Sequence, residues 1–205
     1  MTPDLKKHEV NKSDGYYDND FQAYVIPVLA GSYHWTKDKN VAFTTMLGSC
    51  VSVCAFDRYA GVGGMNHFLL PQASDHENEK FSGSYRYGSA AIETLLNSLY
   101  ARGAAKNGMT VKLFGGARVL KQGVSDTGKK NIAFAEDCLK REKMRIESND
   151  TGGFAGRRII FFPTTGRVLS RRIGDQSRIN EIIAAEQKEM HRIIKKPETK
   201  DVELF

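Results

Sequence analysis

The hydrophobic residues of this chain recur at two spacings, and the shorter one predicts most of its structure. Runs rich in β-branched and aromatic residues, bounded by glycine-containing turns, are typical of strands. The first run, FQAYVIPVLAGSYHW, predicts a strand that ends at Gly31. Further strands are predicted in residues 40–48, 50–57, 62–71, 109–117, 144–153 and, as two segments, 157–173.

The run CVSVCAFD at residues 50–57 shows the strand pattern most clearly. Period-two spacing divides its side chains between two faces of a sheet. One face carries Val51, Val53 and Ala55, and the other carries Cys50, Ser52, Cys54 and Phe56. The residues RYAG that follow predict a hairpin turn into the next strand.

Helical spacing occurs at three places. The clearest helix covers residues 88–102, with Ser89 as its N-cap and Gly103 just past its end. Its apolar positions are Ile92, Leu95, Leu96, Leu99 and Tyr100. A second helix is predicted to start near Asn131, with inward-facing Ile132, Ala135, Cys138 and Leu139. A third pattern, in the tail, carries Ile179, Ile182, Ile183, Met190, Ile193 and Ile194 and stops at Pro197.

Strands outnumber helices and come in antiparallel-looking clusters, which favours the α+β class over a doubly wound sheet. A chain of 205 residues is long enough for one well-buried domain. We expect the polar residues 1–20 to be a tail that is disordered or at least not part of the core. Residues 21–175 should form the domain, and residues 176–205 should be an amphipathic helix and tail. The isoleucines of that helix favour docking on the domain itself, with a protein partner or self-association as the alternatives.

Composition narrows the class of protein. The net charge is +6, and the basic residues come in short pairs rather than in a patch interleaved with aromatic residues, which disfavours nucleic-acid binding. No apolar run is long enough to predict membrane insertion, and the polar N-terminus does not resemble a signal peptide. The three cysteines, Cys50, Cys54 and Cys138, are not spaced like zinc ligands, and their odd number disfavours a disulfide framework. Reduced thiols in a cytoplasmic protein are therefore expected.

Cys50 and His67 are the candidate catalytic pair. If the strands that carry them form a hairpin turned at RYAG, the two residues face each other, or nearly so, across the ladder. An imidazole beside a thiol lowers its pKa and later delivers a proton to the leaving group. A third group normally orients such a base, and Thr44, Thr45 and Asn66 are candidates for this role.

A buried structural thiol is the competing interpretation, because cysteine is among the most buried residue types. Cys54 lies four residues beyond Cys50 on the same strand face, and core packing is the expected role for it. The spacing alone leaves a thiol-bearing structural or redox domain open as a function class.

The segment TMLGSCVSVCAFD followed by GVGGMNHFLLP resembles the signature of the CheD family, the chemoreceptor glutamine deamidases. Later segments resemble that family in the same order: YRYGSAAIETLLNSLYARGA, VKLFGGARVL, GKKNIAFAEDCL and DTGGFAGRRIIFFPTTGRV. The resemblance covers roughly residues 22–173. It implies Cys50 as nucleophile, His67 as base and Thr44 as the residue that orients the base, in a fold of packed β-sheets with helices outside.

The resemblance also implies a reaction. The Cys50 thiolate would attack the carboxamide of a receptor glutamine, and a γ-glutamyl thioester would then be hydrolysed to glutamate, with no cofactor and no metal ion. Gly48, Ser49 and Asn66 are the oxyanion-hole and substrate-groove candidates. The substrates would be the cytoplasmic helices of methyl-accepting receptors, and Arg86 and the Arg157–Arg158 pair are candidates for steering them. The alternative is regulation by binding, to receptors or to a CheC-type phosphatase.

Overall fold

The computed structural model describes residues 10–70, 83–119, 126–175, 177–182, 184, 185 and 188, with the backbone alone for residues 83–88. In this part of the chain the strands form two five-stranded sheets. The first sheet has the order β1 (Tyr16–Asp18), β2 (Ala23–Pro27), β4 (Val41–Leu47), β9 (Gly156–Phe162) and β10 (Arg167–Ile173). The second has the order β3 (Ser32–Thr36), β6 (Val62–His67), β5 (Val51–Asp57), β7 (Met109–Gly115) and β8 (Arg145–Thr151).

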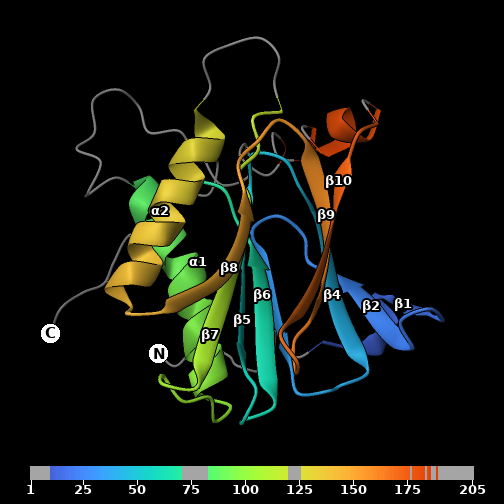
Figure 1. Cartoon of the computed structure of the whole chain (residues 1–205), viewed down its shortest axis with the longest axis vertical. Coiled ribbons are helices and arrows are strands. Elements are labelled where there is room, and N and C mark those ends of the chain that lie inside the picture. The colour runs from blue at the N-terminus through green and yellow to red at the C-terminus, as the bar shows by residue number, and fades with distance from the viewer. Residues whose placement is uncertain are drawn as a thin grey trace, which may run out of the picture.

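Two helices cover one face of the second sheet. Helix α1 (Gly83–Tyr100) packs on β3, β5 and β6, and α2 (Thr127–Arg141) packs on β5 and β8. Both lie on the side of this sheet that faces away from the first sheet, so the molecule has three layers (Figure 1). The predicted α+β class, with packed sheets flanked by helices, is confirmed. No helix in the described part of the chain is long and apolar enough to cross a membrane.

The two apolar cores follow from the predicted strand faces. Val51, Val53 and Ala55 are buried against the helices, together with α1 residues such as Leu95 and Leu99. The opposite face of β5 supplies Cys50, Cys54 and Phe56 to the core between the two sheets. The period-two division of β5 is thus confirmed, and it places Cys50 between the sheets rather than under the helices.

The structure refines two predictions near the N-terminus. The strand predicted to end at Gly31 is β2, which already ends at Pro27; the chain then turns at Gly31, whose φ is +75°, and enters the second sheet as β3. Residues 12–18, expected to be disordered or at least outside the core, form the short 3-10 helix Lys12–Asp14 and strand β1, and none of their side chains is fully buried. Backbone pairing of β1 with β2 orders this segment although its side chains are largely exposed.

The start of the tail helix packs on the domain. Ile179 and Ile182 are buried in a cluster with Ile173 of β10, and Val119 packs against them. This agrees with docking of the helix on its own domain for the residues that the structure describes. The later apolar positions Ile183, Met190, Ile193 and Ile194 lie outside the described side chains.

Candidate functional site

Strand β4 brings two adjacent threonines to opposite faces of the first sheet. Val41, Phe43 and Leu47 point into the core between the sheets, and Thr45 shares their side because side chains alternate along a strand. Thr44 lies on the outer face with Ala42. Its hydroxyl donates to the carbonyl of Ile159 at 2.9 Å, and the Arg158 Nε atom donates to the same hydroxyl at 3.3 Å.

The β5–β6 hairpin sets the relation between Cys50 and His67. Asp57 pairs with Val62, so the turn contains four residues, 58–61. The Asp57 carboxylate, itself buried, accepts from the backbone N–H groups of Tyr59, Ala60 and Ala105 and holds this turn closed. The same register continues to the Val51–Phe68 bridge.

This register corrects the predicted one by two positions. It places His67 across from Ser52, so Cys50 is diagonal to His67 instead of directly opposite. A shift of two keeps both side chains on the same sheet face, and diagonal neighbours lie about 7–8 Å apart, within reach of a long side chain. Cys50 has 0% and His67 has 5% of its surface exposed, so the pair is enclosed between the sheets.

The hydrogen bonds of His67 fix which ring nitrogen is basic. Its Nδ1 atom lies 2.8 Å from Thr45 Oγ1, and that hydroxyl donates its single proton to the carbonyl of Val28, also at 2.8 Å. A carbonyl can only accept, so Thr45 Oγ1 must accept from the His67 Nδ1–H. The neutral ring therefore carries its lone pair on Nε2, as a general base requires.

The loop before β5 is held by its carbonyl groups. The carbonyl of Gly48 accepts from the Ala117 N–H at 2.7 Å, and the carbonyl of Cys50 accepts from the Gly116 N–H at 2.7 Å. Between them, the carbonyl of Ser49 accepts from Asn131 Nδ2 at 2.8 Å. Three successive peptide groups are thus anchored to the end of β7 and the start of α2.

Comparison with known proteins identifies the family. The family model described as CheD chemotactic sensory transduction matches residues 69–172. A protein of Halorhodospira halophila, named probable chemoreceptor glutamine deamidase CheD, is 40% identical over 194 residues, which cover 93% of this chain and 88% of its own. This chain belongs to the CheD family.

Two further relatives carry the same family name. The CheD protein of Caulobacter vibrioides is 44% identical over 156 residues, covering 76% of this chain and 82% of its own. That of Herminiimonas arsenicoxydans is 38% identical over 191 residues, covering 93% of each chain. Both carry the name probable chemoreceptor glutamine deamidase CheD. A solved structure of a Bacillus licheniformis protein is a more distant likeness, with a TM-score of 0.38 and 10% identity over 73% of this chain and 66% of its own.

The site residues implied by the CheD resemblance do not all meet. Cys50 and His67 share a face, but the hydroxyl on the imidazole is that of Thr45, while the Thr44 hydroxyl is on the outer face of the first sheet. Asn66 alternates with His67, and its amide bonds to Val53 N and to the carbonyl of Ala91 in α1. Its side chain therefore faces the helices instead of the Cys50 thiol.

The other two thiols lie in the cores. Burial raises the pKa of Cys54 far above its ordinary value, which agrees with a packing role between the sheets. Cys138 lies on the buried face of α2. Its burial and, to a lesser extent, the negative charges of Glu93, Glu142 and Asp137 raise its pKa to about 11. Neither thiol is positioned or activated to act as a nucleophile.

The arginines considered for electrostatic steering of receptor helices differ in how accessible they are to a partner. Arg157 is only 1% exposed, and its guanidinium donates to the carbonyls of Gly115, Asp150 and Gly152. Arg157 therefore supports the β8–β9 turn and cannot meet an incoming partner. Arg158 is half-buried and reaches Thr44 and the Tyr16 hydroxyl, while the side chain of Arg86 lies outside the described residues.

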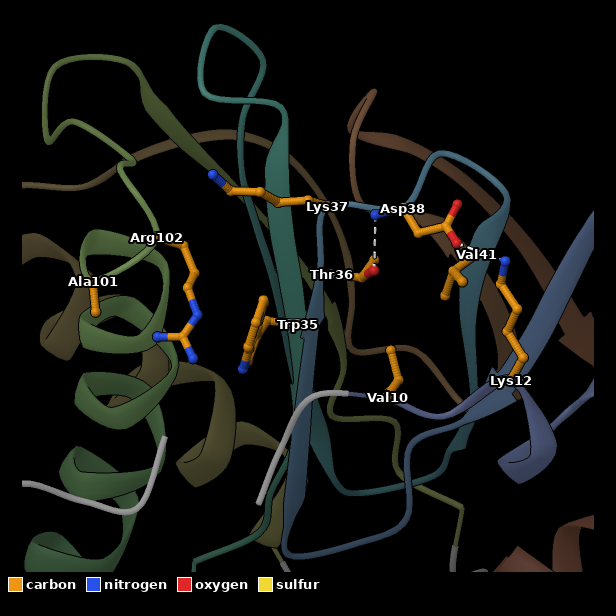
Figure 2. A pocket seen from close by; sticks show the side chains of 9 residues that line it. All are labelled: Val10, Lys12, Trp35, Thr36, Lys37, Asp38, Val41, Ala101 and Arg102. Atoms are coloured by element: carbon orange, nitrogen blue, oxygen red, sulfur yellow. Dashed lines mark hydrogen bonds and ion pairs between the residues drawn. The ribbon is translucent and has the colours of Figure 1, made fainter. Parts of the chain in front are cut away.

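A groove of about 570 Å³ lies away from Cys50 and His67. Figure 2 shows the side chains that line it. The groove is lined by Val10, Lys12, Trp35, Thr36, Lys37, Asp38, Val41, Ala101 and Arg102. His67 pairs with Ser32 at one end of β3, whereas the groove takes Trp35 and Thr36 at the other end, roughly 13 Å along the strand. This groove is therefore not the candidate active site, because Cys50 and His67 do not line it.

The sequence alone left Thr45 as one of three candidates for orienting the base, and it missed Asn131 as a partner of the loop before Cys50. The alternation of buried residues in β4 would have favoured Thr45 over Thr44, because Thr45 shares its parity with Phe43 and Leu47. No local signal identified Asn131 as a partner of the loop before Cys50, since it lies 82 residues from Ser49 in the sequence.

Proposed function

We propose that this chain hydrolyses glutamine side chains of chemoreceptors to glutamate, with Cys50 as nucleophile and His67 as base. The names of its CheD relatives support the reaction and the substrate class. The observation that carries the residue assignment is the bonding of His67. Its Nδ1–H is held by Thr45, so the lone pair of the neutral ring is on Nε2, and His67 and Cys50 lie on the same face of the second sheet.

The first half of the reaction forms a thioester. His67 Nε2 takes the proton of the Cys50 thiol, and the thiolate attacks the carboxamide carbon of glutamine. The carbonyl oxygen gains a negative charge in the tetrahedral intermediate. When that intermediate collapses, the C–N bond breaks, and the imidazolium gives its proton to the departing nitrogen, which leaves as ammonia.

The second half releases glutamate. His67 Nε2 now takes a proton from water, and the resulting hydroxide attacks the thioester carbon. The C–S bond breaks, the proton on His67 regenerates the Cys50 thiol, and the γ-carboxylic acid loses its proton to solvent, where the released ammonia takes it up. All proton transfers to and from the thiol, the leaving ammonia and the attacking water pass through this one ring, so the proposed reaction uses neither a metal ion nor an organic cofactor.

Thr45 is the orienting residue in this scheme. Its oxygen accepts from Nδ1–H in both protonation states of the ring, and the bond becomes stronger when the imidazolium forms. The resemblance gives this role to Thr44, and the hydroxyl of Thr44 is engaged by Ile159 and Arg158 on the outer face. We therefore assign the orientation of the base to the Thr45 hydroxyl. Thr44 contributes through its backbone carbonyl, which accepts a hydrogen bond from the Val28 N–H.

A structural or binding role is the second candidate, and the burial of Cys50 favours it. A thiol with 0% exposure is what an inert core cysteine also shows. A protein-borne glutamine reaches this thiol only after neighbouring side chains move apart. A chain of this kind would act by binding receptors or a CheC-type phosphatase without turnover.

The test is to incubate the whole chain with receptor cytoplasmic fragments and to measure ammonia release and the mass difference between glutamine and glutamate at each site. Cys50→Ala should abolish both signals. Cys54→Ala, which removes a neighbouring buried thiol on the same face, is the matched control and should retain them. A wild-type chain that binds the fragments without turnover would establish the binding role instead.

A further inference from the structure

The loop before Cys50 departs from strand geometry in a way that points to a function. In an extended strand, successive carbonyl groups point to alternate sides. Here the carbonyls of Gly48, Ser49 and Cys50 all accept from one neighbouring region, through Ala117 N, Asn131 Nδ2 and Gly116 N. The loop is therefore turned, and the Ser49 carbonyl lies on the side of α2, where Asn131 donates to it.

Asn131 supplies the only side chain among those three donors. It is 0% exposed at the start of α2, and its Oδ1 atom accepts from the Leu70 N–H at 2.9 Å. Its Nδ2 atom donates to the Ser49 carbonyl at 2.8 Å. The two partners fix the orientation of the amide, since a carbonyl can only accept and an N–H can only donate. One side chain thus joins the residue before Cys50 to a residue three positions after His67.

The orientation of the Ser49–Cys50 peptide group follows from this contact. The C=O and N–H of a trans peptide point in opposite directions in one plane. No peptide bond in the described part of the chain is cis. Because Asn131 holds the Ser49 carbonyl on the α2 side, the Cys50 N–H points to the opposite side. A backbone N–H at the nucleophile itself is the usual kind of oxyanion donor in acyl transfer.

We infer that Asn131 is a positioning residue for the deamidation, which aims the Cys50 N–H at the oxyanion and ties the nucleophile loop to the strand that carries His67. This inference rests on the proposed function. The contact requires an amide, because it uses one donor and one acceptor on a short side chain. Aspartate keeps the shape and the acceptor for Leu70 but loses the donor for Ser49.

The test compares Asn131→Asp and Asn131→Ala with Cys138→Ala in the full chain. Cys138 is buried on the same helix and packs in the helix-side core, so its truncation reports helix packing alone. For each variant, kcat and KM are measured by ammonia release from receptor fragments. The plateau rate of Cys50 alkylation by iodoacetamide is measured at high pH, where it does not depend on the thiol pKa.

We expect both Asn131 variants to lose about 30-fold or more in kcat, with KM changed less than about threefold, because the oxyanion exists only along the reaction. Alkylation develops no oxyanion, so its plateau rate should stay within about threefold of wild type. Cys138→Ala should keep kcat within about twofold of wild type.

Two results would overturn the inference. One is a kcat of Asn131→Asp within about threefold of wild type. The other is a parallel fall of kcat and alkylation in both variants, which would reveal a general disordering of the loop. A wild-type chain that releases no ammonia while Cys50 alkylates normally would instead refute the proposed function, so the two failures are distinguishable.

Discussion

Replacing Thr45 with valine removes the hydroxyl that contacts His67 and keeps the shape of the side chain. The hydroxyl oxygen lies 2.8 Å from both His67 Nδ1 and the Val28 carbonyl. Thr45 is only 7% exposed, so water does not readily replace the lost partner. In Thr45→Val the imidazole keeps its packing but loses the acceptor that selects its tautomer and stabilises its charged form.

The expected magnitude follows from the charge of the ring. A hydrogen bond to an ionised group contributes about 1.5–3 kcal/mol. The imidazolium forms during turnover, and each 1.4 kcal/mol of barrier changes a rate roughly tenfold. Thr45→Val should therefore reduce kcat about 10- to 150-fold. It should also lower the free energy of unfolding by about 1–3 kcal/mol, because the Val28 carbonyl loses a buried donor.

Thr44→Val is the matched comparison. It removes a hydroxyl from the adjacent position on the same strand and breaks the bond to the Ile159 carbonyl, with a similar expected loss of stability. Its effect on kcat should be less than about threefold, because this hydroxyl does not touch the base. Ammonia release at saturating receptor fragment gives kcat, and thermal unfolding gives stability. A larger kcat loss for Thr44→Val than for Thr45→Val would refute the assignment of the tautomer through Thr45.

Three more predictions concern thiols, pH and salt. At about pH 8, iodoacetamide should modify Cys50 in the native chain and spare Cys54 and Cys138, whose pKa values are raised by burial, while mass spectrometry after unfolding should find all three labelled. Burial alone would raise the pKa of Asp57, but its three backbone N–H donors hold that pKa below the ordinary value. The ionised Asp57 therefore stabilises the fold fully above about pH 4, and this contribution is lost as the pH falls through the lower pKa of the folded state. Asp57→Ala should therefore lose about 1–3 kcal/mol of unfolding free energy at neutral pH and show a shallower decline in acid, and an unchanged acid slope would contradict this. With a net charge of +6, turnover of receptor fragments should fall as salt is raised, whereas turnover of a small neutral glutamine amide should not, and salt-independent receptor turnover would exclude electrostatic steering.

The sequence predicted the elements and their faces well, because both depend on local periodicity. The faces of β5 and the apolar stripe of α1 are those that the spacing indicated. The register of the β5–β6 hairpin was missed by two residues, since hydrophobic alternation fixes the parity of a pairing but not the length of its turn. Asp57 closes a four-residue turn here. With this turn length, His67 lies across from Ser52, and Cys50 is its diagonal neighbour instead of its direct partner.

Contacts between distant segments could not be predicted from the chain pattern. The pairing of β4 with β9 and the bond from Asn131 to Ser49 join residues about a hundred positions apart. The order β1-β2-β4-β9-β10 likewise depends on packing that no local propensity specifies. Strand spacing and the family resemblance both pointed to Cys50 and His67, and only the structure showed which of two adjacent threonines lies against the imidazole.

The proposed mechanism requires Cys50 to form a covalent intermediate with a receptor glutamine. The most direct measurement is the intact mass of the chain after a reaction with a receptor-derived glutamine peptide is quenched in acid. An adduct equal to the peptide minus ammonia is expected, which maps to Cys50 after digestion and is absent in Cys50→Ala. Turnover of the peptide by Cys50→Ala, or an adduct on another residue, would contradict it.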